Sequence, residues 1–342
     1  MRPRAFLALL VLVLAVVGVG CPCNGIVNDS PSLRWWLFSN FGASKVCPEM
    51  TKRGVPLRIA QLGQGSVGRF FPGQCQVQVD DVRKAMVLTT TGSGYVMLPV
   101  ARRVGFTITM TVEYLPDFRL ESDAMYVWGR FNRFVVEPNL QIVGVENALV
   151  NLATLTPVGT VAQVIGNGLV ASEIGKGFTV VRRDDSDDFT LGHLDPPQKP
   201  VRQFQPGKGR VLLESNVTTI ATVERDYLGP FEVPNDNAAL FLHARTTGAA
   251  VNYTIVDRSV GEAWRRLYES VQPLGPAPGL TVGQGRLEAN GADANLGLPV
   301  NRGVYYIVLE NLAPPTLLGA VLPIGGDTPA TVSYSVEVGD RR

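Results

Sequence analysis

Few side chains of this chain could support hydrolysis, because its 342 residues include only two histidines, His193 and His243. A histidine-based hydrolase pairs its imidazole with a serine and a carboxylate, and His193 lies near Asp188 and Asp195 in the sequence. The G-x-S-x-G turn that exposes a nucleophilic serine does not occur, since the residue two positions before Ser66 is not glycine. The pattern favours structural roles for both histidines, and a secreted hydrolase that uses His193 remains a second alternative.

An acidic run between two expected strands is the candidate metal site. It contains Asp184, Asp185, Asp187 and Asp188. Ca²⁺ takes about six to eight oxygen ligands from such side chains, but Phe189 occupies the position where an EF-hand loop requires glycine. Runs of like charge are usually solvated. We therefore favour a solvated turn, and the sequence predicts no cofactor.

A glycine-rich segment, Gly63–Gly68 (GQGSVG), matches the G-x-G-x-x-G pattern of dinucleotide sites. That site requires a helix after the glycines to hold the pyrophosphate. Here Phe70, Phe71 and Pro72 follow, so we expect a glycine-rich hairpin loop. The net charge of +1 gives no general electrostatic basis for binding nucleic acid.

The four cysteines, Cys21, Cys23, Cys47 and Cys75, all lie in the first quarter of the chain. In an oxidising compartment, Cys47 and Cys75 form the most natural pair. That arrangement leaves Cys23 unpaired. A competing arrangement pairs all four cysteines and leaves no thiol for a lipid.

The first 20 residues have the anatomy of an export signal. Arg2 and Arg4 precede an apolar run over residues 5–20. These 16 residues are fewer than the ~20 that a transmembrane helix requires. The segment therefore predicts a cleaved signal peptide.

The end of this segment, Val19-Gly20-Cys21, resembles the lipobox of bacterial lipoproteins, although Gly18 stands where leucine is usual. The resemblance implies that Cys21 is acylated and becomes the first residue of the mature protein. Stable anchoring takes more than one acyl chain. Pro22 replaces the aspartate that retains many such proteins at the inner membrane, which implies a lipid anchor in the outer membrane.

The remaining sequence predicts a mainly β protein, with an N-terminal α+β domain followed by a C-terminal antiparallel β-sandwich. The first domain is expected to be a twisted sheet or partial barrel. The alternation of Gly105–Leu115 predicts a half-buried strand, and two short helices are expected near 146–172, ending at Gly175. The predicted boundaries are a signal peptide at 1–20, the lipidated cysteine and a linker at 21–54, and domains at 55–200 and 201–342.

The last third contains the strand Gly303–Asn311 and a final strand within 330–336. Their layout resembles the small sandwich modules of secreted bacterial proteins, namely pre-peptidase C-terminal and GOLD-like domains. The resemblance implies an accessory binding module without a catalytic motif. A short helix, Gly261–Val271, is expected between its strands, with Trp264 and Leu267–Tyr268 on its inward side.

These patterns together predict a non-enzymatic lipoprotein of the cell envelope that acts as a binding or scaffold module. Its expected partners are the membrane, through the lipid anchor, and other envelope proteins or glycans, with no nucleic acid. The first alternative is a carrier of lipid or another hydrophobic ligand, motivated by the apolar strands near residues 106–112 and 126–135.

Overall fold

The structure is a computed structural model that describes residues 23–59, 65–99, 101–147, 164–183, 187–312 and 328–341. Its helices are short. They are α2 (Cys23–Asn28), α3 (Pro31–Leu37), the π-helix η1 (Phe38–Gly42), α4 (Ala43–Met50), the π-helix η3 (Val164–Val170), α7 (Ala171–Gly175) and α8 (Arg258–Glu269).

Strands make up most of the fold, so the predicted mainly β class is confirmed. The strands before residue 200 are β1 (Val55–Arg58), β2 (Ser66–Asp80), β3 (Ala85–Leu98), β4 (Arg102–Leu120), β5 (Met125–Val145), β6 (Phe178–Arg182) and β7 (Asp187–Leu191). Those after it are β8 (Arg210–Ile220), β9 (Glu224–Val233), β10 (Ala238–Gly248), β11 (Val251–Asp257), β12 (Thr281–Leu287), β13 (Asp293–Leu298), β14 (Gly303–Asn311) and β15 (Ala330–Asp340).

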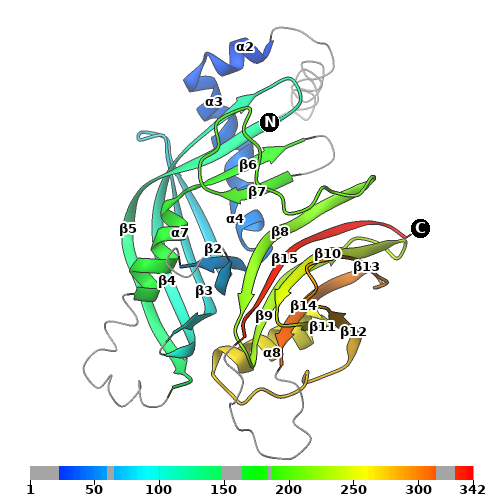
Figure 1. Ribbon diagram of the computed structural model, residues 1–342. Coiled ribbons are helices and arrows are strands. Elements are labelled where there is room, and N and C mark those ends of the chain that lie inside the picture. Colours follow the sequence, from blue (N-terminus) through cyan, green and yellow to red (C-terminus); the bar gives the residue numbers. More distant parts are fainter. Residues whose placement is uncertain are drawn as a thin grey trace, which may run out of the picture.

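One large sheet runs through the whole molecule, in the order β13-β10-β15-β8-β2-β3-β4-β5-β6-β7, with β1 paired to β2 (Figure 1). Its neighbouring strands are antiparallel except where β2 meets β8 through a single parallel pair, Ser66 with Thr218. A second sheet, β12-β11-β14-β9, faces the β8 to β13 end. We call residues 23–191 the proximal unit and residues 210–341 the sandwich unit.

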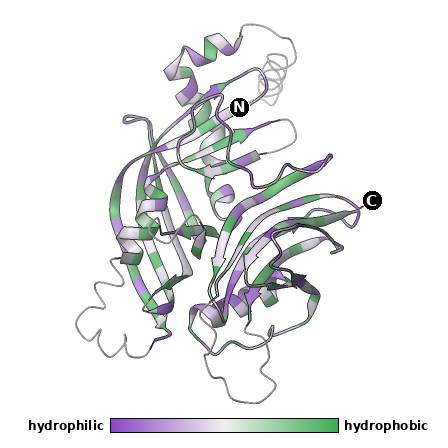
Figure 2. Cartoon of the chain, in the orientation of Figure 1, coloured by the Kyte–Doolittle hydropathy of each residue, from purple (hydrophilic) through white to green (hydrophobic). Residues whose placement is uncertain are grey.

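The proximal unit has a curved sheet whose inner face is filled by helices. Along β4, Phe106, Ile108, Met110 and Val112 are buried in its core, as the alternation predicts, and Thr107 is exposed on the opposite face. The long strands accordingly carry mixed hydrophobic and hydrophilic bands in Figure 2. Side chains of η1, α4, η3 and α7 complete the core, and among the described strands the sheet remains open.

Residues 23–50 are helical, whereas composition had indicated a linker there. Ser30 caps α3, because its hydroxyl accepts a hydrogen bond from the backbone N–H of Leu33 at 3.4 Å, and Pro31 suits the first helical turn. Phe38 and Val46 enter the proximal core. The helices form because their apolar side chains cover one end of this core.

The predicted disulfide is confirmed: Cys47 of α4 is bonded to Cys75 of β2. The two cysteines are 28 residues apart. Closing such a loop removes chain entropy from the unfolded state and contributes about 3.6 kcal/mol in the chain-entropy model. The bond ties α4, and the segment that follows it, to the sheet.

The sandwich unit has its own core between the two sheets. Leu240 and Leu242 of β10, Val332 of β15 and Ile307 of β14 are buried there, as expected for inward positions of alternating strands. The two larger described cores thus lie before β8 and from β8 onward, and a third, smaller core contains residues of both units.

Helices were predicted from the sequence at 261–271 and near 146–172. Trp264 and Tyr268 of α8 are buried as expected, but Leu267 points outward and is 46% exposed. The described end of the 146–172 tract is helical and α7 ends at Gly175, while residues 148–163 lie outside the described part. Leu267 was misplaced because a single helix face cannot bury two consecutive residues equally.

Helix α8 packs on the outer face of the proximal sheet. A Cβ at Gly105 of β4 would lie 1.6 Å from the carbonyl oxygen of Glu269, and a Cβ at Gly144 of β5 would lie 2.8 Å from a methyl of Val271. Gly105 and Gly144 are cross-strand partners. Only glycine at both positions lets the helix approach this closely, which places α8 between the two units.

Candidate functional site

The two units meet through a cluster of aromatic side chains. Phe71 and Tyr95 come from the proximal sheet, and Tyr227, Trp264 and Tyr268 come from the sandwich unit. The rings of Tyr95 and Tyr268 lie edge to face, with centroids 4.8 Å apart. Such pairs stabilise by about 0.5–1.5 kcal/mol beyond their burial. The junction is therefore packed like a domain core.

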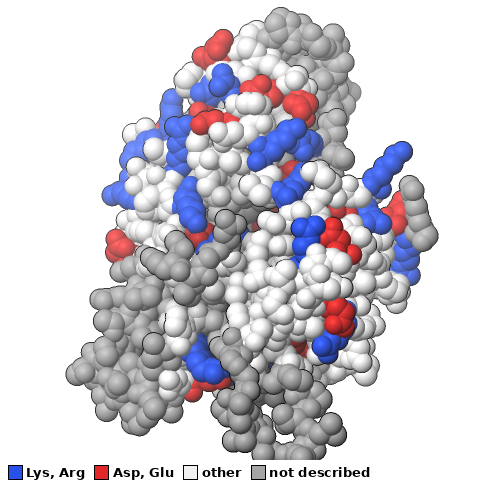
Figure 3. Space-filling model, in the orientation of Figure 1, with Lys and Arg blue, Asp and Glu red and all other residues white. Residues whose placement is uncertain are grey.

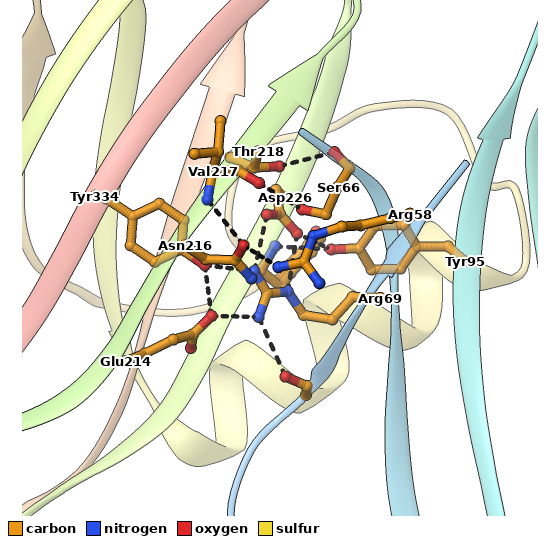
Figure 4. A network of polar contacts seen from close by, with 12 residues as sticks. Arg58, Ser66, Arg69, Tyr95, Glu214, Asn216, Val217, Thr218, Asp226 and Tyr334 are labelled. Atoms are coloured by element: carbon orange, nitrogen blue, oxygen red, sulfur yellow. Dashed lines mark hydrogen bonds and ion pairs between the residues drawn. The ribbon is translucent and has the colours of Figure 1, made fainter. Parts of the chain in front are cut away.

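Arg69 of β2 lies fully buried at the centre of this junction (Figure 4). Its Nε and Nη2 donate to the two carboxylate oxygens of Asp226 at 3.1 and 3.0 Å. Nη1 donates to Glu214 at 2.8 Å and to the carbonyl oxygen of Gly54 at 3.2 Å. Nη2 also donates to the Tyr334 hydroxyl at 2.9 Å. All five guanidinium N–H groups thus have an acceptor.

Acid–base equilibria at the junction follow from this pairing. Burial opposes ionisation of both partners, but their mutual attraction dominates. This attraction raises the pKa of Arg69 above the ordinary arginine value and lowers the pKa of Asp226 below the ordinary aspartate value. Burial raises the pKa of Tyr95, whose hydroxyl donates to Asp226 at 2.6 Å. The network satisfies every N–H of Arg69, although Oε2 of Glu214 has no partner among the described residues, and because it stays charged it holds the units together.

A second carboxylate, Glu224 at the start of β9, is buried with weaker compensation. Its Oε2 accepts a hydrogen bond from Tyr268 at 2.5 Å, and its Oε1 has no partner among the described residues. Burial raises the pKa of Glu224 to about 7, with Glu146 adding to the rise and Arg103 opposing it. This group therefore exchanges a proton near neutral pH, inside the packed junction.

A cleft of about 1230 Å³ opens between the units next to this junction. One wall is the outer face of β2, β3 and β4, where the described lining includes Thr91, Ser93, Thr107 and Thr109. The other wall combines α8 with the nearer ends of β8, β9 and β14. The segment after α4 closes one side through Lys52 and Arg53.

Positive charge dominates the described lining of the cleft. Its basic members are Lys52, Arg53, Arg182, Arg183, Arg258, Arg265 and Arg266, and its acidic members are Glu49, Glu232 and Glu262. Seven positive charges against three negative ones leave an excess of four, while the whole chain carries only +1. Basic side chains also gather where β6 and β7 approach β8 (Figure 3).

Several of these cations are already paired within the protein. Lys52 contacts Glu49 at 2.5 Å, and Arg258 contacts Glu262 at 2.6 Å. Arg265 pairs with Glu269, donates to Ser93 at 3.0 Å and covers the ring of Phe71 at 4.2 Å. These contacts position α8 against the proximal sheet and leave less charge for a ligand.

Arg53 and Arg266 differ from these paired cations. Neither guanidinium has an ion pair or a side-chain hydrogen bond within the part of the chain that the structure describes. Arg53 is partly buried and also lines a smaller cavity of about 170 Å³ beside Glu214. Burial lowers its pKa below the ordinary arginine value, although arginine remains charged at neutral pH. Glu214, Glu49 and Asp188 attract Arg53 from a distance, but none forms an ion pair with it, so a charged and poorly solvated guanidinium still favours an anionic ligand.

Comparison with known proteins gives no family assignment. No family model matches the sequence, and no curated protein is significantly similar to it. The function must therefore be inferred from the geometry of the chain itself.

The residues singled out by sequence are dispersed. His193 Nε2 lies 2.9 Å from Asp195 and 3.2 Å from Arg130, and among the described residues no hydroxyl or thiol side chain hydrogen bonds to it. His243 faces outward from β10, 3.3 Å from Arg210. Neither imidazole lines the cleft, so the geometry does not support a histidine-based nucleophile there.

The acidic run lies only partly within the described residues. Asp184 and Asp185 are outside them, and so is the side chain of Asp187. Asp188 is buried and pairs with Arg202 and Arg183. No group of three or more metal-ligating side chains occurs in the described ranges, and the pairing of Asp188 with cations disfavours a metal role for this residue.

Two other candidates from the sequence, the cysteine predicted to be acylated and the glycine-rich segment, lie wholly or partly outside the described residues. Cys21 lies before its first residue, so acylation stays a prediction. Residues 60–64 lie outside it as well, but Gly65 and Ser66 lead directly into β2. A strand therefore follows the glycine-rich segment, in place of the helix that a dinucleotide site requires.

Sequence reasoning missed the cleft. Its cations come from separate stretches, after α4, at β6 and on α8, and no motif connects them. A helix with Arg258, Glu262, Arg265 and Arg266 on one side was the available signal. The chemistry that the cleft offers is hydrogen bonding and charge pairing.

Proposed function

We propose that this protein is a non-enzymatic envelope lipoprotein, tethered through Cys21 to the outer membrane, whose inter-unit cleft binds another component of the envelope. The observation that carries the proposal is the polar cleft of about 1230 Å³ with its excess of basic side chains. A concave, preformed site with convergent polar groups is the usual form of a binding site. The disulfide between Cys47 and Cys75 suits an oxidising compartment outside the cytoplasm.

The surface formed by the first described residues supports the tether. Ile26, Trp36 and Phe41, on α2, α3 and η1, are 68%, 45% and 51% exposed. The rings of Trp36 and Phe41 lie 5.8 Å apart, and aromatic side chains favour the headgroup level of a membrane. Helices α2 and α3 lie at the end of the proximal unit away from α8 (Figure 1). A membrane at that end would leave the cleft accessible.

A carrier of hydrophobic ligands receives less support. The apolar face of β4, which suggested such a cavity, packs against Phe38, Ile165 and Leu169. The larger described cavity mixes apolar residues such as Leu212 and Phe231 with seven basic side chains, whereas a lipid requires predominantly apolar walls without such charges. The described helices include none long and apolar enough to cross a membrane.

The tether is tested with the full chain and its Cys21→Ser variant, expressed in a bacterium. We expect the wild-type protein in the membrane pellet, released by detergent and not by salt, and the variant in the soluble extract. Intact-mass analysis should show a chain that begins at Cys21 and carries acyl groups. A mature chain that begins elsewhere, or carries a bare or bridged thiol at Cys21, would contradict the tether.

Binding in the cleft is tested by placing a photoreactive amino acid at Thr109, which is exposed in the cleft wall, and at Val282 on β12 as a control. After irradiation with isolated envelope material, we expect adducts at position 109 and none at position 282. Equal labelling at both positions, or none at Thr109, would reject the cleft as the binding site, whatever the chemistry of the ligand.

A further inference from the structure

We infer that the ligand of this cleft is an acidic glycan, a chain of sugars that carries carboxylate or phosphate groups. The inference rests on the proposed binding function and specifies its ligand. Arg53 and Arg266 would pair with the anionic groups, and the Thr- and Ser-bearing wall would bind the sugar hydroxyls.

The charge argument starts from these two arginines. A guanidinium presents a planar fork of donors that matches carboxylates and phosphates. Arg53 comes from the segment after α4 and Arg266 from α8, so the cations are provided by different walls. Anionic groups repeated along a chain would satisfy both, whereas one small anion would engage a single point.

The hydroxyl argument comes from the register of the outer face of the sheet. Gln74, Thr91, Thr109 and Asn139 stand side by side on four adjacent strands. Ser93, Thr107 and Gln141 form the next row across three of them. Neighbouring strands are ~4.8 Å apart, so the face presents a regular array of hydroxyl and amide groups. Such groups both donate and accept hydrogen bonds, as sugar hydroxyls do.

Other ligand classes fit this surface less well. A peptide bound by strand addition requires a free sheet edge; β3 and β4 are paired on both sides, and although β9 ends the second sheet, the hydroxyl-bearing wall offers a peptide no edge. Single-stranded nucleic acid requires exposed aromatic platforms, and Phe71 and Tyr306 in the cleft are buried. A lipid requires predominantly apolar walls, and this lining includes seven basic side chains among its apolar ones. The volume of about 1230 Å³ also exceeds the roughly 300–1,000 Å³ of small-molecule pockets, which suits an oligomer.

The test is isothermal titration of the full-length protein with four probes of similar length. They are an oligogalacturonate, a phosphorylated mannose oligomer, a neutral glucose oligomer and an oligoglutamate. We expect at least one acidic glycan to bind at least about tenfold more tightly than the neutral glycan and the peptide, with affinity falling as salt rises. A neutral glycan or oligoglutamate that binds as tightly, or no binding by either acidic glycan, would overturn the inference. Cross-linking at Thr109 would still test the binding function independently.

Substitutions inside and outside the cleft test where the acidic glycan binds. Arg53→Gln and Arg266→Gln each remove one unpaired cation and should weaken the acidic glycan about tenfold or more. Arg286→Gln on β12 removes an equal charge from an exposed pair with Glu288 and should leave affinity unchanged. The double variant Thr91→Val, Thr109→Val keeps the β-branched shape and should weaken glycan binding without changing the salt dependence. Equal effects of Arg53→Gln and Arg286→Gln would reject the assigned site.

Discussion

Two arginines near the junction of the units, Arg69 and Arg53, differ in whether the described chain supplies partners for their guanidinium groups. Arg69 is fully buried and its five N–H groups all reach acceptors. Arg53 lies on the edge of the cleft, and within the described chain it has no ion pair. The network around Arg69 holds the units in place, and Arg53 is the cation that we propose pairs with a ligand.

The largest expected effect comes from opening the closed network. Replacing Arg69 with Met leaves the carboxylates of Asp226 and Glu214 buried and unpaired, which costs about 3–5 kcal/mol. We expect the free energy of unfolding, measured with denaturant, to fall by this amount. Arg69→Lys keeps the charge but has fewer donors and no planar fork, so its loss should be intermediate.

The matched control for this change is Arg286→Met, which removes an exposed arginine and should change stability by less than about 0.5 kcal/mol. If Arg69→Met unfolded at the wild-type denaturant concentration, the network would not hold the units together. Arg69 would then have no stabilising role to contrast with the role proposed for Arg53.

A slightly smaller effect is expected at the disulfide, which ties the helix preceding Arg53 to β2. Replacing Cys47 and Cys75 together with Ser removes a cross-link between residues 28 apart and should lower the free energy of unfolding by about 3.6 kcal/mol. Because α4 positions Arg53, ligand affinity should also fall, more than it does in Arg286→Gln. A variant with wild-type affinity would show that Arg53 is positioned by other contacts.

Much of the fold could be predicted from local patterns, and the site could not. The alternation around Phe106, the buried face of α8 and the Cys47–Cys75 pair each depend on short-range periodicity or on the small number of cysteines. The single sheet that joins both units, by contrast, depends on one pairing between Ser66 and Thr218, which no local pattern encodes. Arg69 reads in the sequence as one more arginine inside a strand.

The cleft was missed for the same reason: Arg53 and Arg266 are 213 residues apart, and they face one cavity only because the two units pack together. The helices of residues 23–50 were missed because the segment was interpreted as a linker, and Phe38 and Val46 become buried only against the finished sheet. Tertiary packing overrides composition there.

The buried carboxyl group of Glu224 should make the stability of the junction depend on pH. Burial raises its pKa to about 7 from an ordinary value of 4.5. The folded state therefore binds this proton more tightly than the unfolded state, so stability falls as pH rises from about 4.5 to about 7 and is level above that. Glu224→Gln removes the penalty and should stabilise the protein by about 3 kcal/mol at pH 8, with little effect at pH 4.

Stability curves measured across this range for the wild type, Glu224→Gln and Glu232→Gln check the sign. Glu232 lies on the same strand and is exposed, so its variant should follow the wild-type curve. The opposite result would be a wild-type protein that becomes more stable than Glu224→Gln as pH rises. It would show that Arg103 compensates the charge of Glu224, so that the ionised carboxylate is fully paired at the junction.

The smallest expected effect on stability is at Arg53. Removing a cation that lacks partners among the described residues relieves desolvation and costs no hydrogen bond, so Arg53→Gln should change the free energy of unfolding by less than about 1 kcal/mol. The same variant should lose most of its affinity for an acidic ligand. A loss of stability like that of Arg69→Met would mean that Arg53 pairs with Glu214 or Glu49 in solution, and the distinction between a closed and an open arginine would fail. A small change in stability together with a large loss of binding is the result that separates recognition from folding in this junction.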